Sequence, residues 1–138
     1  MNPVASSSLE YIKISSTDDP TINWLGAFAC YGGKGAANTV VVPFAIEPGG
    51  HLGWHTDSLE ETQYIISGQG EFQRDDGTWQ VGPGDIFVVE ADVRHDLKNT
   101  GQEPLTAIAF FSGPAIVQKF DSTMLPPNGH VLESPNAG

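Results

Sequence analysis

The chain has little positive charge and almost no cysteine. Its 138 residues include six lysines and arginines against 17 aspartates and glutamates, which gives a formal net charge of −11. Because nucleic acids and anionic membrane surfaces are bound through clustered positive charge, neither is an expected partner. The single cysteine, Cys30, cannot form a disulfide within the chain, so the fold needs no oxidising compartment.

Long hydrophobic runs are also missing. No apolar stretch approaches the roughly 18–20 residues of a membrane span. Residues 1–8 are polar and lack the basic and apolar regions of a signal peptide. A length of 138 residues corresponds to one compact domain. We therefore expect a cytoplasmic protein with a single domain.

Glycine and proline are abundant, with 16 and 10 copies, and they separate short apolar runs. The runs are rich in β-branched and aromatic residues, and none has a sustained helical period of 3.6 residues. Asp76-Gly77 is a typical hairpin turn between two of them. The predicted strands are residues 11–14, 22–30, 39–46, 62–66, 70–74, 78–81, 86–89, 93–98 and 105–111. This pattern predicts an all-β fold, an antiparallel sandwich or barrel.

The predicted strands divide the chain into three parts. Residues 1–38 form an N-terminal arm and the first strands, which belong to the barrel or to a dimer contact. Residues 39–111 form the core of the barrel. Residues 112–138 are rich in proline and show little periodicity, so we expect a tail that packs over the barrel or over a neighbouring subunit.

Three of the four histidines fall in two short windows that also contain isolated acidic residues. Side chains on a strand repeat every two residues on one face, so His55 and Asp57 project together. His51 shares that face if the strand extends far enough back. Glu61 begins the next predicted strand, and His95 lies on a later one. Imidazole and carboxylate groups brought together inside a small barrel form a site for a divalent ion.

At these residues the sequence resembles the cupin family. The first cupin motif is a glycine, five residues, His-x-His, three or four residues, a glutamate, six residues and a glycine. Gly49, His55, Asp57, Glu61 and Gly68 keep every spacing, with Asp57 where the second histidine normally stands.

The second cupin motif is a glycine, five residues, Pro-x-Gly, two residues, a histidine, three residues and an asparagine. Gly84, His95 and Asn99 keep their positions, whereas Glu90 and Asp92 replace the proline and the second glycine. The two motifs are separated by the 15 residues 69–83, and the resemblance covers residues 39–111.

The resemblance implies a cupin jelly-roll barrel in which His55, Glu61 and His95 are metal ligands. Asp57 either completes a set of two histidines and two carboxylates or lies outside it, in which case His51 swings in or three protein ligands suffice. Two carboxylates balance the charge of one divalent ion and favour iron or manganese, with zinc, nickel and cobalt as alternatives.

The resemblance leaves three functions open. The first is an iron- or manganese-dependent dioxygenase, similar to the quercetinase-like cupins, that acts on a small, uncharged or weakly acidic organic molecule. The second is a redox-neutral lyase, isomerase or cyclase that uses the metal as a Lewis acid. In both, Asp57, Glu61 or His51 is the candidate catalytic residue that moves a proton. The third is a small-molecule-binding module without catalysis.

Four residues are candidates for the wall of the substrate pocket: Gln63, Phe44, Leu97 and Phe110. Gln63 shares the strand face of Glu61, and Leu97 shares the face of His95. A barrel of this size has exposed strand edges, so we expect it to form a homodimer.

Overall fold

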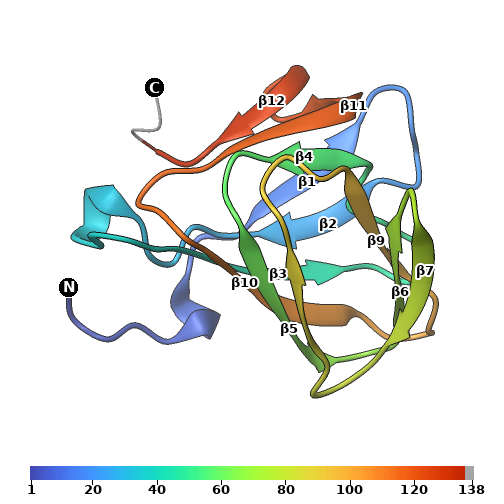
Figure 1. The fold of residues 1–138 in the computed structure, drawn as a ribbon, viewed down its shortest axis with the longest axis horizontal. Coiled ribbons are helices and arrows are strands. Elements are labelled where there is room, and N and C mark those ends of the chain that lie inside the picture. The colour runs from blue at the N-terminus through green and yellow to red at the C-terminus, as the bar shows by residue number, and fades with distance from the viewer. Residues whose placement is uncertain (136–138) are drawn as a thin grey trace.

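The computed structural model describes residues 1–135 (Figure 1). These residues form strands β1 Ile12–Ser16, β2 Asn23–Gly26, β3 Val40–Ile46, β4 His55–Asp57, β5 Glu61–Ser67, β6 Gly70–Arg74, β7 Gly77–Val81, β8 Ile86–Val89, β9 His95–Asn99, β10 Leu105–Phe111, β11 Val117–Leu125 and β12 Gly129–Glu133. Two single-turn 3-10 helices, η1 Ser6–Ser8 and η2 Gly32–Lys34, complete the described elements. Within this part of the chain, no helix is long and apolar enough to cross a membrane.

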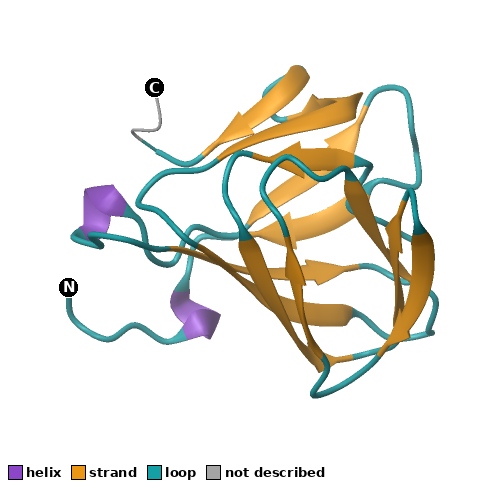
Figure 2. Cartoon of the chain, in the orientation of Figure 1, coloured by secondary structure: helices purple, strands orange, loops and turns teal. Residues whose placement is uncertain are grey.

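The strands form one antiparallel sheet that curls around a core, as Figure 2 shows. The strand order is β7-β6-β9-β4-β11-β1-β2-β3-β10-β5-β8, and β12 pairs with β11 alone. Because β1 and β11 join the two halves of this path, β4 and β9 face β3, β5 and β10 across the interior. The all-β prediction is therefore confirmed.

The segment predicted to be a tail instead supplies two strands. β11 is nine residues long and pairs with both β1 and β4, and β12 pairs with it. Its inward residues Phe120 and Met124 are buried, whereas Lys119 and Asp121 on either side of Phe120 are exposed. The even spacing of two large apolar residues is only a weak local signal for a strand. The strand forms because β11 pairs with β1 and β4, which are distant in the sequence. Residues 136–138 of the predicted tail lie outside the described part.

The predicted strand 22–30 is also too long. Regular pairing with both neighbours is confined to β2, and Cys30 makes only an isolated bridge to Val41.

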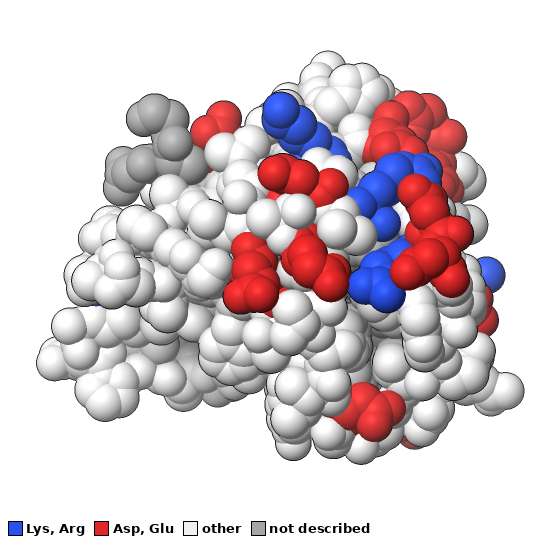
Figure 3. All heavy atoms as spheres, viewed as in Figure 1, with Lys and Arg blue, Asp and Glu red and all other residues white. Residues whose placement is uncertain are grey.

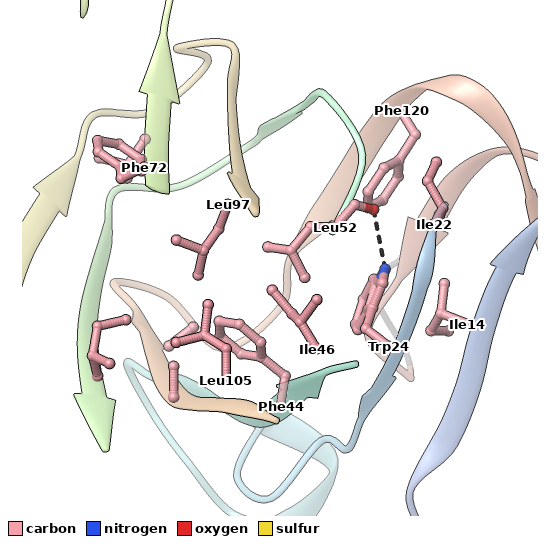
Figure 4. Close-up of a cluster of buried hydrophobic side chains, with 14 of the residues drawn as sticks. Ile14, Ile22, Trp24, Phe44, Ile46, Leu52, Phe72, Leu97, Leu105 and Phe120 are labelled. Carbon is pink, nitrogen blue, oxygen red and sulfur yellow. Dashed lines mark hydrogen bonds between the residues drawn. The ribbon is translucent and has the colours of Figure 1, made fainter. Parts of the chain in front are cut away.

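The core lies between the two halves of the curled sheet. Along β10 the inward residues Leu105, Ala107, Ala109 and Phe111 are buried, in the alternation expected of a half-exposed strand. Figure 4 shows large side chains from both halves packed together, and the Trp24 indole donates a hydrogen bond of 3.0 Å to the Leu52 carbonyl. Each such side chain stabilises the fold by about 1.5–3 kcal/mol through burial. The polar site described next lies against this apolar interior.

Candidate metal centre

The two inward-facing histidines come from neighbouring strands. β4 begins at His55 and β9 begins at His95, and these residues are direct partners in the ladder between the two strands. Their ring centroids are 4.3 Å apart, and both side chains are buried. A single pair of register partners therefore brings together two residues that are 40 positions apart in the sequence.

The backbone orients both imidazole rings in the same way. Nδ1 of His55 lies 2.7 Å from the carbonyl oxygen of Gly53, and Nδ1 of His95 lies 2.8 Å from that of Val93. A carbonyl only accepts hydrogen bonds, so each Nδ1 carries a proton and each Nε2 is the nitrogen left to bind an ion. Gly53 is required here: its φ is +101°, and a Cβ would lie 2.9 Å from Ile22 Cδ1.

Two buried carboxylates lie beside these nitrogens. Asp57 Oδ2 is 3.2 Å from His95 Nε2, and Asp57 Oδ1 is 3.6 Å from His55 Nε2. One ligand atom from each of these three residues falls within 4.8 Å of the others. Glu61, the first residue of β5, places Oε1 3.3 Å from His95 Nε2. Three of the motif residues predicted to bind a metal therefore form one compact group, and Glu61 joins it through its contact with His95.

The cluster has the chemistry of a cation site. Asp57 Oδ2, Glu61 Oε1 and His95 Nε2 are fully buried and make no hydrogen bond within residues 1–135. A buried polar atom without a partner costs about 1–3 kcal/mol, and charged groups cost more. A divalent ion would satisfy all three atoms at once. Two imidazole nitrogens and two carboxylates form a donor set that fits iron, manganese or zinc.

Without an ion, the close approach of these charged groups shifts their pKa values, and His95 and Glu61 bind protons more strongly than usual. Burial disfavours a charged His95, but Asp57 and Glu61 outweigh burial and raise its pKa to about 10. Burial and the charge of Asp57 raise the pKa of Glu61 to about 7. Burial also opposes ionisation of Asp57, yet His55 and His95 hold its pKa below the ordinary value. Burial and the neighbouring His95 lower the pKa of His55.

Two glutamine side chains hold the carboxylates in place. Gln63 Nε2 donates a hydrogen bond of 3.1 Å to Glu61 Oε2, and Gln118 Nε2 donates one of 2.9 Å to Asp57 Oδ1. Gln63, predicted as pocket wall, does not line the cavity beside the site and instead holds the candidate ligand Glu61. Gln118 was missed by the sequence analysis because it lies on β11, where it is the register partner of Asp57. Its position two residues before the inward Phe120 is the only local signal that could have revealed it.

A small cavity of about 30 Å³ adjoins the candidate ligands, which is room for one or two water molecules. Its wall is mostly apolar and consists of Trp24, Val42, Phe44, Leu52, Ala109, Phe111, Gln118 and Phe120, with His55 and Glu61. Phe44 thus lines it, as the sequence analysis expects of a pocket residue. Phe120, stacked on the His55 ring at 4.6 Å between centroids, was missed together with the rest of β11.

Two predicted wall residues lie elsewhere. Phe110 is 43% exposed on the outer face of the sheet, because the inward positions of β10 are odd-numbered and its neighbour Phe111 faces the cavity. Leu97 is completely buried in the apolar core and does not line the cavity.

His51 does not share the face of His55. β4 begins only at His55, and the turn at Gly53 separates the two histidines. Both ring nitrogens of His51 are used elsewhere: Nδ1 lies 2.6 Å from Asp96 Oδ2, and Nε2 lies 2.9 Å from Asp19 Oδ2. His51 therefore has no lone pair to offer to the cluster.

Comparison with known protein families places this chain in one of them. A family model of the cupin domain matches residues 43–111, half of the chain, so the chain belongs to the cupin family. This confirms the resemblance seen in the two motifs. The search of curated proteins found no match.

Solved structures share the fold. The polyketide cyclase RemF from Streptomyces resistomycificus is 17% identical, with a TM-score of 0.68 over 99% of this chain and 89% of that chain. A sugar phosphate isomerase of the cupin superfamily from Silicibacter pomeroyi is 18% identical, with a TM-score of 0.68 over 99% and 94% of the two chains. A predicted oxalate decarboxylase from Thermotoga maritima is 20% identical, with a TM-score of 0.70 over 81% and 99%. These likenesses confirm the cupin barrel.

Proposed function

We propose that this chain is a metal-dependent cupin enzyme, an iron- or manganese-dependent oxygenase acting on a small, uncharged or weakly acidic organic molecule. The observation that carries the proposal is the buried convergence of two imidazole nitrogens and two carboxylates, of which three atoms make no hydrogen bond among the described residues. Such a cluster costs stability unless it serves an ion.

The ligand set supports a redox-active ion. The two carboxylates, Asp57 and Glu61, balance the charge of a divalent ion, and an electron-rich ligand set with two negative charges stabilises the higher oxidation state. When bound, the ion would supply the redox chemistry with dioxygen that side chains lack.

The protein's own groups would position the site and handle protons. Gln118 fixes Asp57 and Gln63 fixes Glu61, so neither carboxylate is free to rotate. Asp57 and Glu61 are the carboxylates beside the cavity, and either would move a proton when substrate displaces it from the ion. Trp24 and Phe120 line the cavity next to the ligands and keep bulk water out.

The charge of the cavity supports a neutral substrate. In the described part of the chain, no lysine or arginine lines the space beside the candidate ligands, so an anionic substrate would find no positively charged side chain to pair with. A sugar phosphate or oxalate, named for two of the similar structures, is therefore a poor match for this site.

A redox-neutral cyclase or isomerase is the second candidate, supported by the fold that this chain shares with a polyketide cyclase. There the ion would act as a Lewis acid while Asp57 or Glu61 transfers a proton.

Oxygen uptake separates the two candidates. Protein purified without chelators and loaded with Fe(II) or Mn(II) would be tested in an oxygen electrode against neutral enols and phenols, beside metal-stripped protein and the His95→Ala variant. The proposal expects oxygen uptake that requires both substrate and metal and is absent from the variant. Equal turnover of a substrate under nitrogen would support the redox-neutral candidate, and failure to take up any metal would contradict both.

We further propose that two copies pair through the outer face of β5, β8 and β10. Its exposed apolar residues are Tyr64, Ile66, Ile86, Val88 and Phe110. The surface over β5 and β8 is uncharged in Figure 3, with acidic residues above it and at its lower margin. Because each copy carries a net charge of −11, two copies repel each other less at an uncharged face.

Light scattering tests this pairing. We expect twice the mass of 14.7 kDa for the wild type and 14.7 kDa for an Ile86→Lys variant. Gln80→Lys, at an exposed residue of β7, is the control and should have the mass of the wild type. A wild-type particle of 14.7 kDa would refute it.

A further inference from the structure

A second, larger pocket lies between β1–β3 and the β11–β12 hairpin. Its volume is about 510 Å³, within the range of pockets that hold drug-sized molecules. Most of its wall is apolar, including Ile12, Trp24, Phe28, Val42, Pro126 and Leu132. We refer to it as the outer pocket, and to the 30 Å³ space beside the ligands as the inner cavity.

The outer pocket and the inner cavity share a wall. Trp24, Val42 and Gln118 line both spaces. Trp24 is held in place by its hydrogen bond to the Leu52 carbonyl, and Gln118 by its hydrogen bond to Asp57. A molecule in the outer pocket would therefore lie one side chain away from a candidate metal ligand.

The wall also defines what the outer pocket would bind. Across the described residues, its lining holds no lysine, arginine or histidine, and its one charged group is Glu133 at the exposed edge of β12. Its other polar groups are the Gln118 amide and Ser134, whose hydroxyl already bonds to Ile116. An anion entering this space would lose its hydration without gaining a positive partner.

We propose that the outer pocket binds the ring system of a neutral, largely apolar substrate, with its reactive end at the Gln118 and Trp24 wall. This inference rests on the proposed function, since it assigns the substrate class of the same metal centre. The inner cavity alone is too small for an organic substrate, so the outer pocket supplies the missing volume.

Direct binding of two matched probes tests the proposal. The probes are 2-naphthol, which is neutral at pH 7, and 2-naphthoate, which has a similar bicyclic ring but carries a negative charge. Calorimetry would measure Kd for both with metal-free and metal-loaded protein, and nuclear magnetic resonance would follow the side-chain amide of Gln118. We expect 2-naphthol to bind at least about tenfold more tightly than 2-naphthoate and to shift the Gln118 signal.

Substitutions at the rim of the outer pocket test whether 2-naphthol binds there. Ile12 is 46% exposed on one wall and Val131 is 38% exposed on the other, so Ile12→Asp and Val131→Asp should both fold. Each should weaken 2-naphthol binding about tenfold by setting a carboxylate against the ring. Val4→Asp, at a residue 51% exposed outside the outer pocket, is the control and should bind like the wild type.

Equal Kd values for all four proteins, or equally tight binding of the two probes, would overturn the inference. Metal content is measured on the same samples, which keeps the two proposals separate. Loss of 2-naphthol binding in both rim variants with metal content unchanged supports the outer pocket. Normal metal content in a wild type that binds neither probe overturns the outer pocket and leaves the metal centre standing.

Discussion

His51 and His95 each lie between two carboxylates, yet their surroundings prepare them for different tasks. His51 contacts Asp19 through one ring nitrogen and Asp96 through the other, so both nitrogens are engaged. His95 gives Nδ1 to the carbonyl of Val93 and turns only Nε2 toward Asp57 and Glu61. The same residue types thus form a structural bridge in one place and a candidate metal centre in the other.

The difference lies in the backbone. A main-chain carbonyl at Nδ1 fixes a proton on that nitrogen, which leaves Nε2 facing two carboxylates and able to bind an ion once it loses its own proton. At His51, two carboxylates take up both nitrogens, and the protonated ring satisfies them. Burial strengthens the contrast. Asp57 and Glu61, the two carboxylates beside His95, are both buried, whereas the Asp19 side chain beside His51 is 30% exposed.

The largest expected effect is the loss of metal on removing an inward histidine. His55→Ala or His95→Ala deletes one of two nitrogen ligands and should abolish stoichiometric metal retention, whereas His51→Ala should leave metal content unchanged. Elemental analysis of the three variants makes the comparison. Normal metal content in both inward variants would remove the site assignment.

Asp57→His should keep the metal and change what the site does. It replaces a carboxylate with the histidine common in the family's first motif, which removes one negative charge from the ligand set. We expect retained metal with a changed metal preference and changed activity, measured by competitive loading with Fe(II), Mn(II) and Zn(II). Unchanged preference and activity would place Asp57 outside the mechanism.

Metal affinity should rise with pH. Although burial opposes its charge, the pKa of His95 is raised to about 10 by Asp57 and Glu61, so an ion must displace a proton from this ring at lower pH. Apparent affinity should increase about tenfold per pH unit between about pH 7 and 9. The rise should be steeper below about pH 7, where Glu61 also holds a proton. Chelator competition measures the slope, and a flat profile would contradict the ligand assignment.

Gln118→Leu should weaken metal binding about tenfold, because residues that orient a ligand typically contribute 10–100-fold in affinity. It removes the amide that fixes Asp57 while leaving all four ligands present. Gln80→Leu on β7, which removes an exposed bond to Glu71, is the matched control and should have wild-type affinity. Equal affinities would show that Asp57 needs no support.

The smallest effect concerns stability at His51. Its hydrogen bond to Asp96 raises the pKa of His51, burial opposes this rise, and Asp19 adds to it. Because the folded pKa is raised, the stabilisation is complete below the unfolded value of about 6.5 and is lost as pH rises through the folded value. His51→Ala should therefore cost about 1–2 kcal/mol at pH 5.5 and less at pH 9 in urea unfolding. A loss independent of pH would mean that His51 is neutral in the fold.

The sequence predicted which charged residues lie together better than it predicted their surroundings. The proximity of His55, Asp57, Glu61 and His95 follows from motif spacing and strand alternation, which are local properties. Gln118 and Phe120 could not be found in this way, because only the pairing of β11 with β4 brings them to the site.

The remaining errors have local causes. The choice of Phe110 over Phe111 is a slip of one residue, which reverses the face of a strand. The placement of His51 failed because the positive φ of Gly53 ends the strand that would have carried it.

The most direct test of the metal centre is anomalous X-ray diffraction from crystals of protein loaded with Mn(II) or Fe(II), collected at the absorption edge of that metal. The account predicts a single strong peak within about 2.0–2.3 Å of Nε2 of both His55 and His95, bounded by Asp57 and Glu61. A peak at His51 and Asp96 instead, or no peak in crystals soaked to saturation, would contradict it.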